Sequence, residues 1–258
     1  MAEACYRRYV AIGDSQTEGL WDGDESTGVR GFADRLAAIV DSHHPGLTYA
    51  NLAIRGKRIA DVLVEQVPPA LAMQPDLITV CAGMNDVIRP GRSFDRALAD
   101  LENLYAQLAA SGATVVTTTF PDIARMLPVG RLLVSRVVTI NDSIRVLAGR
   151  FGFRLVDLYG AASMMDPDTW SADRVHGSTK GHILFAAAAA EALGLPSSNH
   201  DWAHSNGSVV RPRLRQRAYS QLLWTQNMLA PWVWRHIRGR SSGDGRVPRR
   251  PRLERVSE

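Results

Sequence analysis

Ser15 stands at the end of the first apolar run of the chain, in the segment YVAIGDSQTEGL, residues 9–20. This pattern predicts a buried strand, a tight Gly13-Asp14 turn and the start of a helix. A serine at that point is exposed at the edge of a sheet, and the unpaired N–H groups of a helix start favour negative charge developing beside it. The position therefore suits a nucleophile for acyl transfer. The alternative is that Asp14 and Ser15 only cap a helix.

Asp173 and His176 lie three residues apart in the segment SADRVHGSTKGH, residues 171–182, in front of a predicted helix. At this spacing a carboxylate can bind one imidazole nitrogen, which fixes the tautomer and leaves the other nitrogen to accept a proton from a serine. The two residues are therefore candidates for the orienting acid and the base. A loop turn or a helix cap would account for the same spacing.

Two further positions are suited to donating hydrogen bonds to a negatively charged oxygen. Gly56 follows the second apolar run, where a residue without a side chain can present its backbone N–H, and Asn85 follows the third with a side-chain amide. Donors of this kind form the oxyanion hole of acyl-transfer enzymes. Taken singly, a glycine and an Asn-Asp pair after strands are also ordinary turn residues.

Short apolar runs and segments of helical spacing alternate along most of the chain. The runs predict strands at residues 9–12, 48–52, 77–82, 114–119 and 154–156, and the segments between and after them predict helices at 32–42, 59–73, 94–110, 132–151 and 181–193. Such alternation is typical of an α/β three-layer sandwich with a five-stranded parallel sheet. Ligand sites of these sheets lie beyond the carboxyl ends of the strands, where Ser15, Gly56 and Asn85 are expected.

In chain order, the segments GDSQTEG, Gly56, GMND and DRVH resemble the blocks of the SGNH/GDSL hydrolase family, whose name lists its Ser, Gly, Asn and His. The resemblance covers about residues 8–195. It implies a flavodoxin-like sheet and a catalytic Ser15. It also implies an oxyanion hole from the backbone N–H groups of Ser15 and Gly56 with the Asn85 side chain, and Asp173 orienting His176.

Two residues depart from the family pattern. Gln16 occupies the place of the leucine in GDSL, and Gly177 occupies the place of a proline that often follows the family's histidine. Neither change removes a group that the chemistry needs. The resemblance implies hydrolysis of ester or thioester bonds of a small-molecule or lipid-like substrate through an acyl-enzyme, with no metal or organic cofactor. Acyl transfer to another acceptor, and a non-catalytic module that docks on an anionic surface, stay open as alternatives.

The end of the chain differs in composition from the rest. Residues 201–258 hold 12 arginines and 4 acidic residues, a net charge of +8, whereas the first 200 residues carry a net charge of −4. We place a boundary near Pro196, between a hydrolase domain at 1–196 and a basic extension at 197–258 that is partly helical with a disordered end. Its Trp224, Trp232 and Trp234 either pack on the domain or join the arginines of 211–217 at an anionic surface, while a nucleic-acid partner is not favoured.

Several features predict a soluble, cytoplasmic protein. The N-terminal segment has no leader-type apolar stretch, and no run has the ~20 apolar residues of a membrane span. Cys5 and Cys81 are predicted to be free thiols in a reducing compartment. The resemblance extends to cytoplasmic family members from actinobacteria. Arg55, Arg58 and Arg89, near the expected site, make an anionic ester a further hypothesis.

Overall fold

The centre of the fold is a six-stranded sheet with the strand order β7-β6-β5-β1-β4-β8. The structure, a computed structural model, describes residues 5–24, 28–88, 93–122, 130–205, 207 and 242–256. The parallel strands are β1 (Arg8–Gly13), β4 (Thr48–Asn51), β5 (Leu77–Cys81), β6 (Thr114–Thr118) and β7 (Arg154–Val156). These are the five strands that the apolar runs predict, with ends shifted by one residue at most. The α/β prediction is therefore confirmed.

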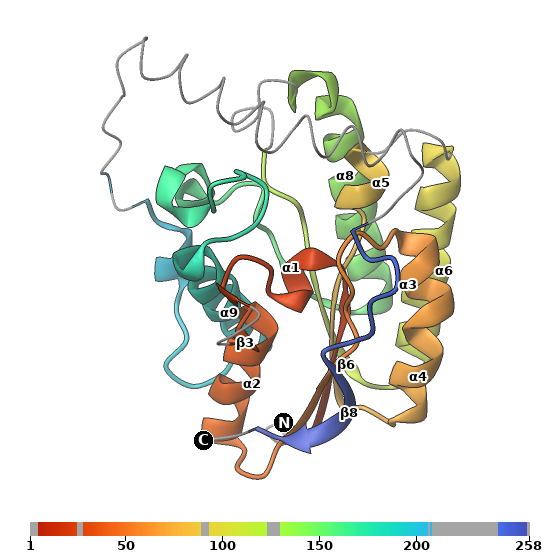
Figure 1. The fold of residues 1–258 in the computed structure, drawn as a ribbon, viewed down its shortest axis with the longest axis vertical. Helices are drawn as coiled ribbons and strands as arrows, with labels where there is room; N and C mark the ends of the chain where they lie inside the picture. Colours follow the sequence, from red (N-terminus) through yellow and green to blue (C-terminus); the bar gives the residue numbers. More distant parts are fainter. Residues whose placement is uncertain are drawn as a thin grey trace.

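Helices cover both faces of this sheet (Figure 1). One face carries α2 (Phe32–His43) and α9 (Thr179–Leu193), and the other carries α3 (Ile59–Glu65), α4 (Val67–Ala72), α6 (Phe94–Ala110) and α8 (Val134–Phe151). Along β1, Val10 and Ile12 belong to one buried cluster and Tyr9 and Ala11 to the other, because successive side chains of a strand point to opposite faces. Burial on both faces explains the continuous apolar runs.

The helix expected over residues 59–73 is divided at Gln66 into α3 and α4, so that prediction is wrong in one respect. Pro68 and Pro69 stand in the first turn of α4, where a missing N–H is tolerated, but they cannot continue a preceding helix. At the break, the Gln66 side chain turns to β1, donating to the carbonyl of Gly13 at 2.9 Å and accepting from its N–H at 2.8 Å. Gln66 therefore anchors the end of the strand that leads to Ser15.

The strand order creates a switch point between β1 and β5. The parallel strands follow the order 2-1-3-4-5 of a flavodoxin-like sheet, and ligands of such sheets bind in the crevice at that point. The short helices α1 (Ser15–Glu18) and α5 (Met84–Ile88) begin there, beyond β1 and β5. The other short elements are the hairpin of β2 (Gly23–Asp24) with β3 (Gly28–Val29) and the 3₁₀ helices η1 (Gly130–Leu132), η2 (Ala162–Met165), η3 (Pro167–Thr169) and η4 (His200–Ala203).

The sixth strand, β8 (Arg250–Arg255), pairs antiparallel with β4 at the edge of the sheet. The prediction of a disordered chain end is therefore wrong for these residues. The segment RPRLER suggests a solvated tail because most of its residues are charged, yet an edge strand tolerates Pro251 and outward-facing charges. Leu253 and Val256 pack against the two buried clusters of the domain.

The packing of the domain continues beyond the predicted boundary near Pro196. Trp202 in η4 is buried in the same cluster as residues of α2 and α9, and its indole N–H donates to Glu191. The described parts of 197–258 thus pack on the same domain as 1–196. The predicted helical extension, with its tryptophans and the arginines of 211–217, lies outside the described residues. In the part of the chain that is described, no helix combines the length and apolarity of a membrane span.

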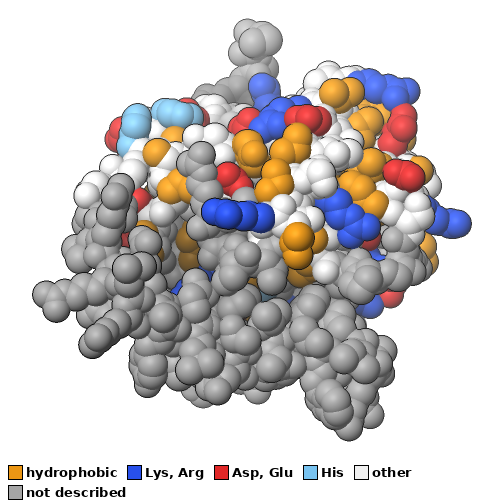
Figure 2. All heavy atoms as spheres, turned by 90° about the horizontal axis from the view of Figure 1, so that it is seen from above, with side chains coloured by type: hydrophobic (Ala, Val, Ile, Leu, Met, Phe, Trp, Pro, Cys, Tyr) orange, Lys and Arg blue, Asp and Glu red, His pale blue; other side chains and the backbone are white. Residues whose placement is uncertain are grey.

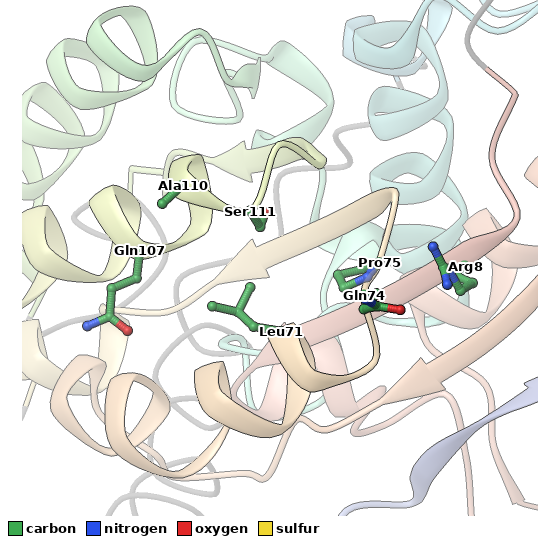
Figure 3. A pocket seen from close by; sticks show the side chains of 7 residues that line it. All are labelled: Arg8, Leu71, Gln74, Pro75, Gln107, Ala110 and Ser111. Atoms are coloured by element: carbon green, nitrogen blue, oxygen red, sulfur yellow. The ribbon is translucent and has the colours of Figure 1, made fainter.

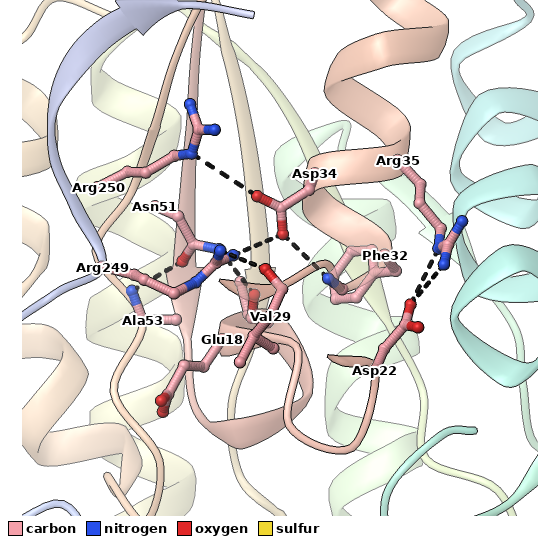
Figure 4. Close-up of polar contacts among 12 residues, drawn as sticks. Glu18, Asp22, Val29, Phe32, Asp34, Arg35, Asn51, Ala53, Arg249 and Arg250 are labelled. Atoms are coloured by element: carbon pink, nitrogen blue, oxygen red, sulfur yellow. Dashed lines mark hydrogen bonds and ion pairs between the residues drawn. The ribbon is translucent and has the colours of Figure 1, made fainter. Parts of the chain in front are cut away.

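Arg249 fastens the C-terminal segment to α2 (Figure 4). Its guanidinium donates to Asp34 Oδ2 at 2.6 Å and to the backbone oxygen of Val29. The neighbouring Arg250 lies 3.8 Å from Asp34 Oδ1, with its guanidinium 5.5 Å from the centre of the Tyr49 ring. Burial raises the pKa of Asp34, and the positive charge of Arg249 opposes that shift. The ion pair therefore offsets the cost of burying the carboxylate.

We expect Arg249→Met to lower the free energy of unfolding at neutral pH by about 2–3 kcal/mol, because Asp34 would keep a buried charge without its main partner. The loss should stay below the ~3–5 kcal/mol of a fully buried pair, since the Arg249 side chain is 28% exposed. The folded-state pKa of Asp34 is already raised in the native protein, and it rises further when Arg249 is removed. In the variant, protonation of Asp34 removes the unpaired charge. The loss of stability should therefore shrink as the pH falls through the Asp34 pKa of the variant.

Urea unfolding at about pH 7.5 and about pH 4.5 measures this difference. Arg252→Met, at an exposed position of β8, is the matched control. If the two variants lose the same stability at both pH values, the ion pair with Asp34 does not fasten the C-terminal segment.

Candidate active site

Ser15 is the first residue of α1, directly beyond the carboxyl end of β1. The strand ends at Gly13, whose φ of 146° favours glycine, and a side chain there would collide with the backbone of Cys81 on β5. Asp14 caps α1, since its carboxylate accepts from the Gln16 N–H at 3.3 Å. The helix cap is thus Asp14 alone, and the Ser15 hydroxyl is available for another partner.

The structure brings Ser15, His176 and Asp173 into one hydrogen-bonded series. His176 Nε2 lies 2.7 Å from Ser15 Oγ, and His176 Nδ1 lies 2.5 Å from Asp173 Oδ2. Ser15 and His176 are 161 residues apart in the chain, and they meet because β1 and the loop before α9 end at the same rim of the sheet. A carboxylate, an imidazole and a hydroxyl in this order can activate the hydroxyl as a nucleophile.

Asp173 also organises the loop that carries His176. Its Oδ1 accepts from Ser171 Oγ at 2.7 Å and from the backbone N–H groups of Val175 at 2.9 Å and His176 at 3.0 Å. Burial on its own would raise the pKa of Asp173, but the hydrogen bond and charge of His176 outweigh burial, and the pKa lies at about 2. An ionised carboxylate beside Nδ1 favours the tautomer with the proton on Nδ1, which leaves Nε2 able to accept a proton from a hydroxyl.

Gly56 and Asn85 lie after β4 and β5, the two strands that flank β1. Gly56 adopts a φ of 78° in the turn before α3. Asn85 Nδ2 donates to Asp14 Oδ2 and to the backbone oxygen of Lys57, both at 3.0 Å. Asn85 thus ties the turn before Ser15 to the backbone directly after Gly56. The sequence did not indicate these two acceptors, because they stand 71 and 28 residues away and form no local motif.

Asp14 is a buried carboxyl at the centre of this group. Burial raises its pKa to about 6, although the hydrogen bond from Gln16, the nearby His176 and the hydrogen bond from Asn85 act in the opposite direction. Asp14 is therefore charged at neutral pH and becomes protonated on mild acidification. Its contacts with Gln16 and Asn85 support the turn before Ser15.

Arg55, expected as part of a cationic rim for anionic esters, is paired inside the protein. Its guanidinium Nη2 lies 2.5 Å from Glu18 Oε1, and its backbone N–H donates to Glu18 Oε2 at 2.6 Å. The Arg55 and Glu18 side chains are only 15% and 10% exposed. Arg55 therefore links α1 to the backbone before Gly56, and this charge is not available to bind a substrate. Arg58 precedes α3, and Arg89 lies outside the described residues.

Cys81 and His182 are kept out of this chemistry by burial. Burial raises the pKa of the Cys81 thiol to about 12, so it is a poor nucleophile at neutral pH. Burial lowers the pKa of His182 to about 4, and its Nδ1 accepts from the backbone N–H of Phe32 at 3.2 Å. His182 is thus a neutral imidazole that joins α9 to α2.

The carboxyl ends of the parallel strands point toward the end of the molecule seen in Figure 2. The described part of this surface mixes hydrophobic, basic and acidic side chains. A pocket of about 370 Å³ lies at the opposite end of the sheet, where Arg8, Pro75 and Ser111 stand just before or at the starts of β1, β5 and β6 (Figure 3). The length of β1 separates this pocket from Ser15, so it is not part of the candidate site.

Residues 11–184 match the model of the GDSL-like Lipase/Acylhydrolase family, and this stretch contains all five predicted site residues. LAE5, an alpha/beta hydrolase enzyme from the metagenome of Lake Arreo in Spain, is 24% identical with a TM-score of 0.62, covering 74% of this chain and 96% of its own. Axe2, an acetylxylan esterase from Geobacillus stearothermophilus, is 19% identical with a TM-score of 0.61, covering 80% and 100%. At these identities the two structures show a shared fold. No curated protein gives a significant match.

Proposed function

The chain belongs to the GDSL-like lipase/acylhydrolase family, and we propose that it hydrolyses small carboxylic esters through an acyl-enzyme on Ser15. Membership makes the protein an SGNH-type hydrolase of ester bonds, whereas the roles of individual residues are our proposal. The observation that supports it most directly is the series of contacts from Asp173 through His176 to Ser15, at 2.5 and 2.7 Å.

In the proposed reaction, Ser15 Oγ attacks the ester carbonyl carbon while its proton passes to His176 Nε2. Asp173 holds the Nδ1 proton and stabilises the imidazolium. The tetrahedral intermediate collapses when the imidazolium gives its proton to the leaving alcohol, and the acyl group stays on Ser15. A water molecule, deprotonated by His176, then attacks this ester. The carboxylic acid leaves and the Ser15 hydroxyl is restored.

We propose the backbone N–H groups of Ser15 and Gly56 and the Asn85 amide as the donors to the oxyanion. The Ser15 N–H belongs to the first turn of α1, where backbone donors have no partner within the helix. Asn85 already donates to Asp14 and Lys57, so a substrate oxygen must share one of its N–H groups or replace one of these acceptors. A role for Asn85 in the reaction and a role in holding the loops are therefore compatible.

Asn85→Ala should lower kcat by ~10²–10³ with little change in KM, the effect of losing one oxyanion-hole donor. It should also lower stability by about 1–2 kcal/mol, because Asp14 and Lys57 lose a donor. Steady-state kinetics and thermal unfolding of one preparation test both effects. Asn103→Ala, on the exposed side of α6, is the matched control. A change in KM alone would assign Asn85 to substrate binding. A loss of stability with normal kinetics would mean that Asn85 only holds the loops together.

A panel of p-nitrophenyl esters of graded chain length tests the activity as a whole. Acetylated xylose and an acyl thioester belong in the panel, the first because Axe2 is an acetylxylan esterase. Added alcohol, as a competing acceptor, measures any acyl transfer. If the folded protein cleaves none of these compounds, the proposed hydrolysis is wrong. We further propose that the enzyme acts in the cytoplasm, which the unpaired Cys5 and Cys81 support and cell fractionation can test.

A further inference from the structure

Gln16, the residue after Ser15, joins α1 to the loop that carries His176. Its Nε2 donates to the backbone oxygen of Val175 at 3.0 Å, and its Oε1 accepts from the backbone N–H of Gly177 at 3.2 Å. These two backbone groups belong to the residues on either side of His176. One side-chain amide therefore holds the backbone of the proposed base from both sides.

Other contacts of this loop act on its internal shape. Asp173 accepts hydrogen bonds from residues of the loop itself, and the Ser171 N–H donates to the backbone oxygen of His176 at 2.9 Å. Gly177 is bridged to Trp170 at the start of the loop. Such contacts hold the loop together as a unit. The Gln16 amide differs from them because its two bonds cross to the helix that begins with Ser15.

The two residues of this bridge are the two at which the chain departs from the family blocks. Leucine in place of Gln16 makes no hydrogen bond, and proline in place of Gly177 has no N–H to donate. In this chain the Gly177 N–H is the donor and Gln16 carries the acceptor, although the two residues are 161 positions apart. The two departures therefore meet in space, and each supplies a partner for the other.

We propose that Gln16 and Gly177 form a matched pair that positions His176 against Ser15. The pair keeps the loop where His176 Nε2 and Ser15 Oγ lie 2.7 Å apart. A displacement of about 1 Å at reacting groups can cost ~10²-fold in rate. Gln16 is a positioning residue, because it acts through the backbone around His176. The inference rests on the proposed function, since it requires His176 to be the base.

Gln16→Leu tests the pair, because it removes both bonds with little change in side-chain size. We expect kcat to fall ~10–100-fold while KM changes less than about 2-fold and the thermal midpoint moves by only a few degrees. Gln16→Glu keeps an acceptor for the Gly177 N–H but turns an oxygen toward the backbone oxygen of Val175. Its kcat should therefore lie between those of the native protein and Gln16→Leu. Gln107→Leu, the same replacement on α6 beside the distant pocket, should leave kcat unchanged (Figure 3).

A double-mutant cycle tests whether the two positions act together. Gly177→Pro removes the donor, and Gly177→Ala is its steric reference, since a Cβ added at this position would lie 3.1 Å from the Phe185 ring. Relative to alanine, proline should lower kcat in the native background and have little effect when Gln16 is already leucine. Equal effects in both backgrounds, or a normal kcat in Gln16→Leu, would overturn the proposal.

Ser15→Ala, assayed on the same ester, separates this inference from the proposed function. An inactive Ser15→Ala together with a normal kcat in Gln16→Leu rejects the positioning pair alone. Activity retained in Ser15→Ala rejects the function on which the pair depends.

Discussion

Ser15→Ala should reduce turnover of an activated ester by up to about a million-fold, the loss seen when the nucleophile of a subtilisin-type triad is removed. The replacement deletes one oxygen atom and leaves the backbone of β1 and α1 unchanged. The deleted oxygen has its partner in His176 Nε2 and not in the core, so thermal unfolding should be nearly unchanged. Steady-state kinetics and a thermal melt of the purified variant measure the two effects.

A covalent probe makes this test sharper. A fluorophosphonate should label the native chain at Ser15 and fail to label Ser15→Ala, because the phosphorus is attacked by the same hydroxyl. Ser143→Ala is the matched control, since the Ser143 hydroxyl on α8 donates to the nearby Thr139 carbonyl, one helical turn away. Normal activity and normal labelling of Ser15→Ala would remove Ser15 as the nucleophile and with it the proposed mechanism.

Asp173→Asn should lower kcat by about 10⁴-fold while the loop around it stays folded. Asparagine keeps an Oδ1 that can accept from Ser171, Val175 and His176, as the aspartate does. Its Nδ2, however, would donate to His176 Nδ1 and move the ring proton to Nε2. An imidazole with a proton on Nε2 cannot accept the proton of Ser15, so the chemistry fails although the geometry is preserved.

Asp173→Ala separates the loss of His176 orientation from the loss of loop structure, because alanine also removes the acceptor for the hydrogen bonds that hold the loop. We expect similar losses of activity in the two variants but a lower thermal midpoint only for alanine. Asp168→Asn, a surface change at the Lys180 ion pair, is the control. The pKa of Asp173 is about 2, so its protonation should not limit the activity of the native protein above about pH 4. A loss below about tenfold in Asp173→Asn would contradict the orienting role.

The parallel sheet could be predicted closely because its strands are buried on both faces. Val10, Ile12 and their counterparts in the neighbouring strands form continuous apolar runs, and these indicate the strands directly. The break at Gln66 was missed because the helical spacing of apolar residues continues across it. Strand β8 was missed because its side chains suit solvent and its partner is the backbone edge of β4, from a distant part of the chain.

The candidate site was predictable as a set of residues and not as an arrangement. Asp173 and His176 share one loop, so their spacing already indicated the contact between them. The contacts that link different loops had no such signal. Glu18 with Arg55, Asn85 with Asp14, and Gln16 with Gly177 are each pairs of ordinary polar residues until the fold brings them together. For Arg55 this reversed the expected role, because its charge is paired inside the protein.

The sequence by itself determined the five central strands, the turn that presents Ser15 and the pairing of Asp173 with His176. These depend on burial patterns and on hydrogen bonds between near neighbours, which a short stretch of chain contains in full. Only the tertiary structure decided that His176 meets Ser15, that Gln16 holds both sides of its loop, and that the chain end completes the sheet. Each of these needs two segments that lie far apart in the chain, and the distance between such segments is set by the packing of the helices on the sheet.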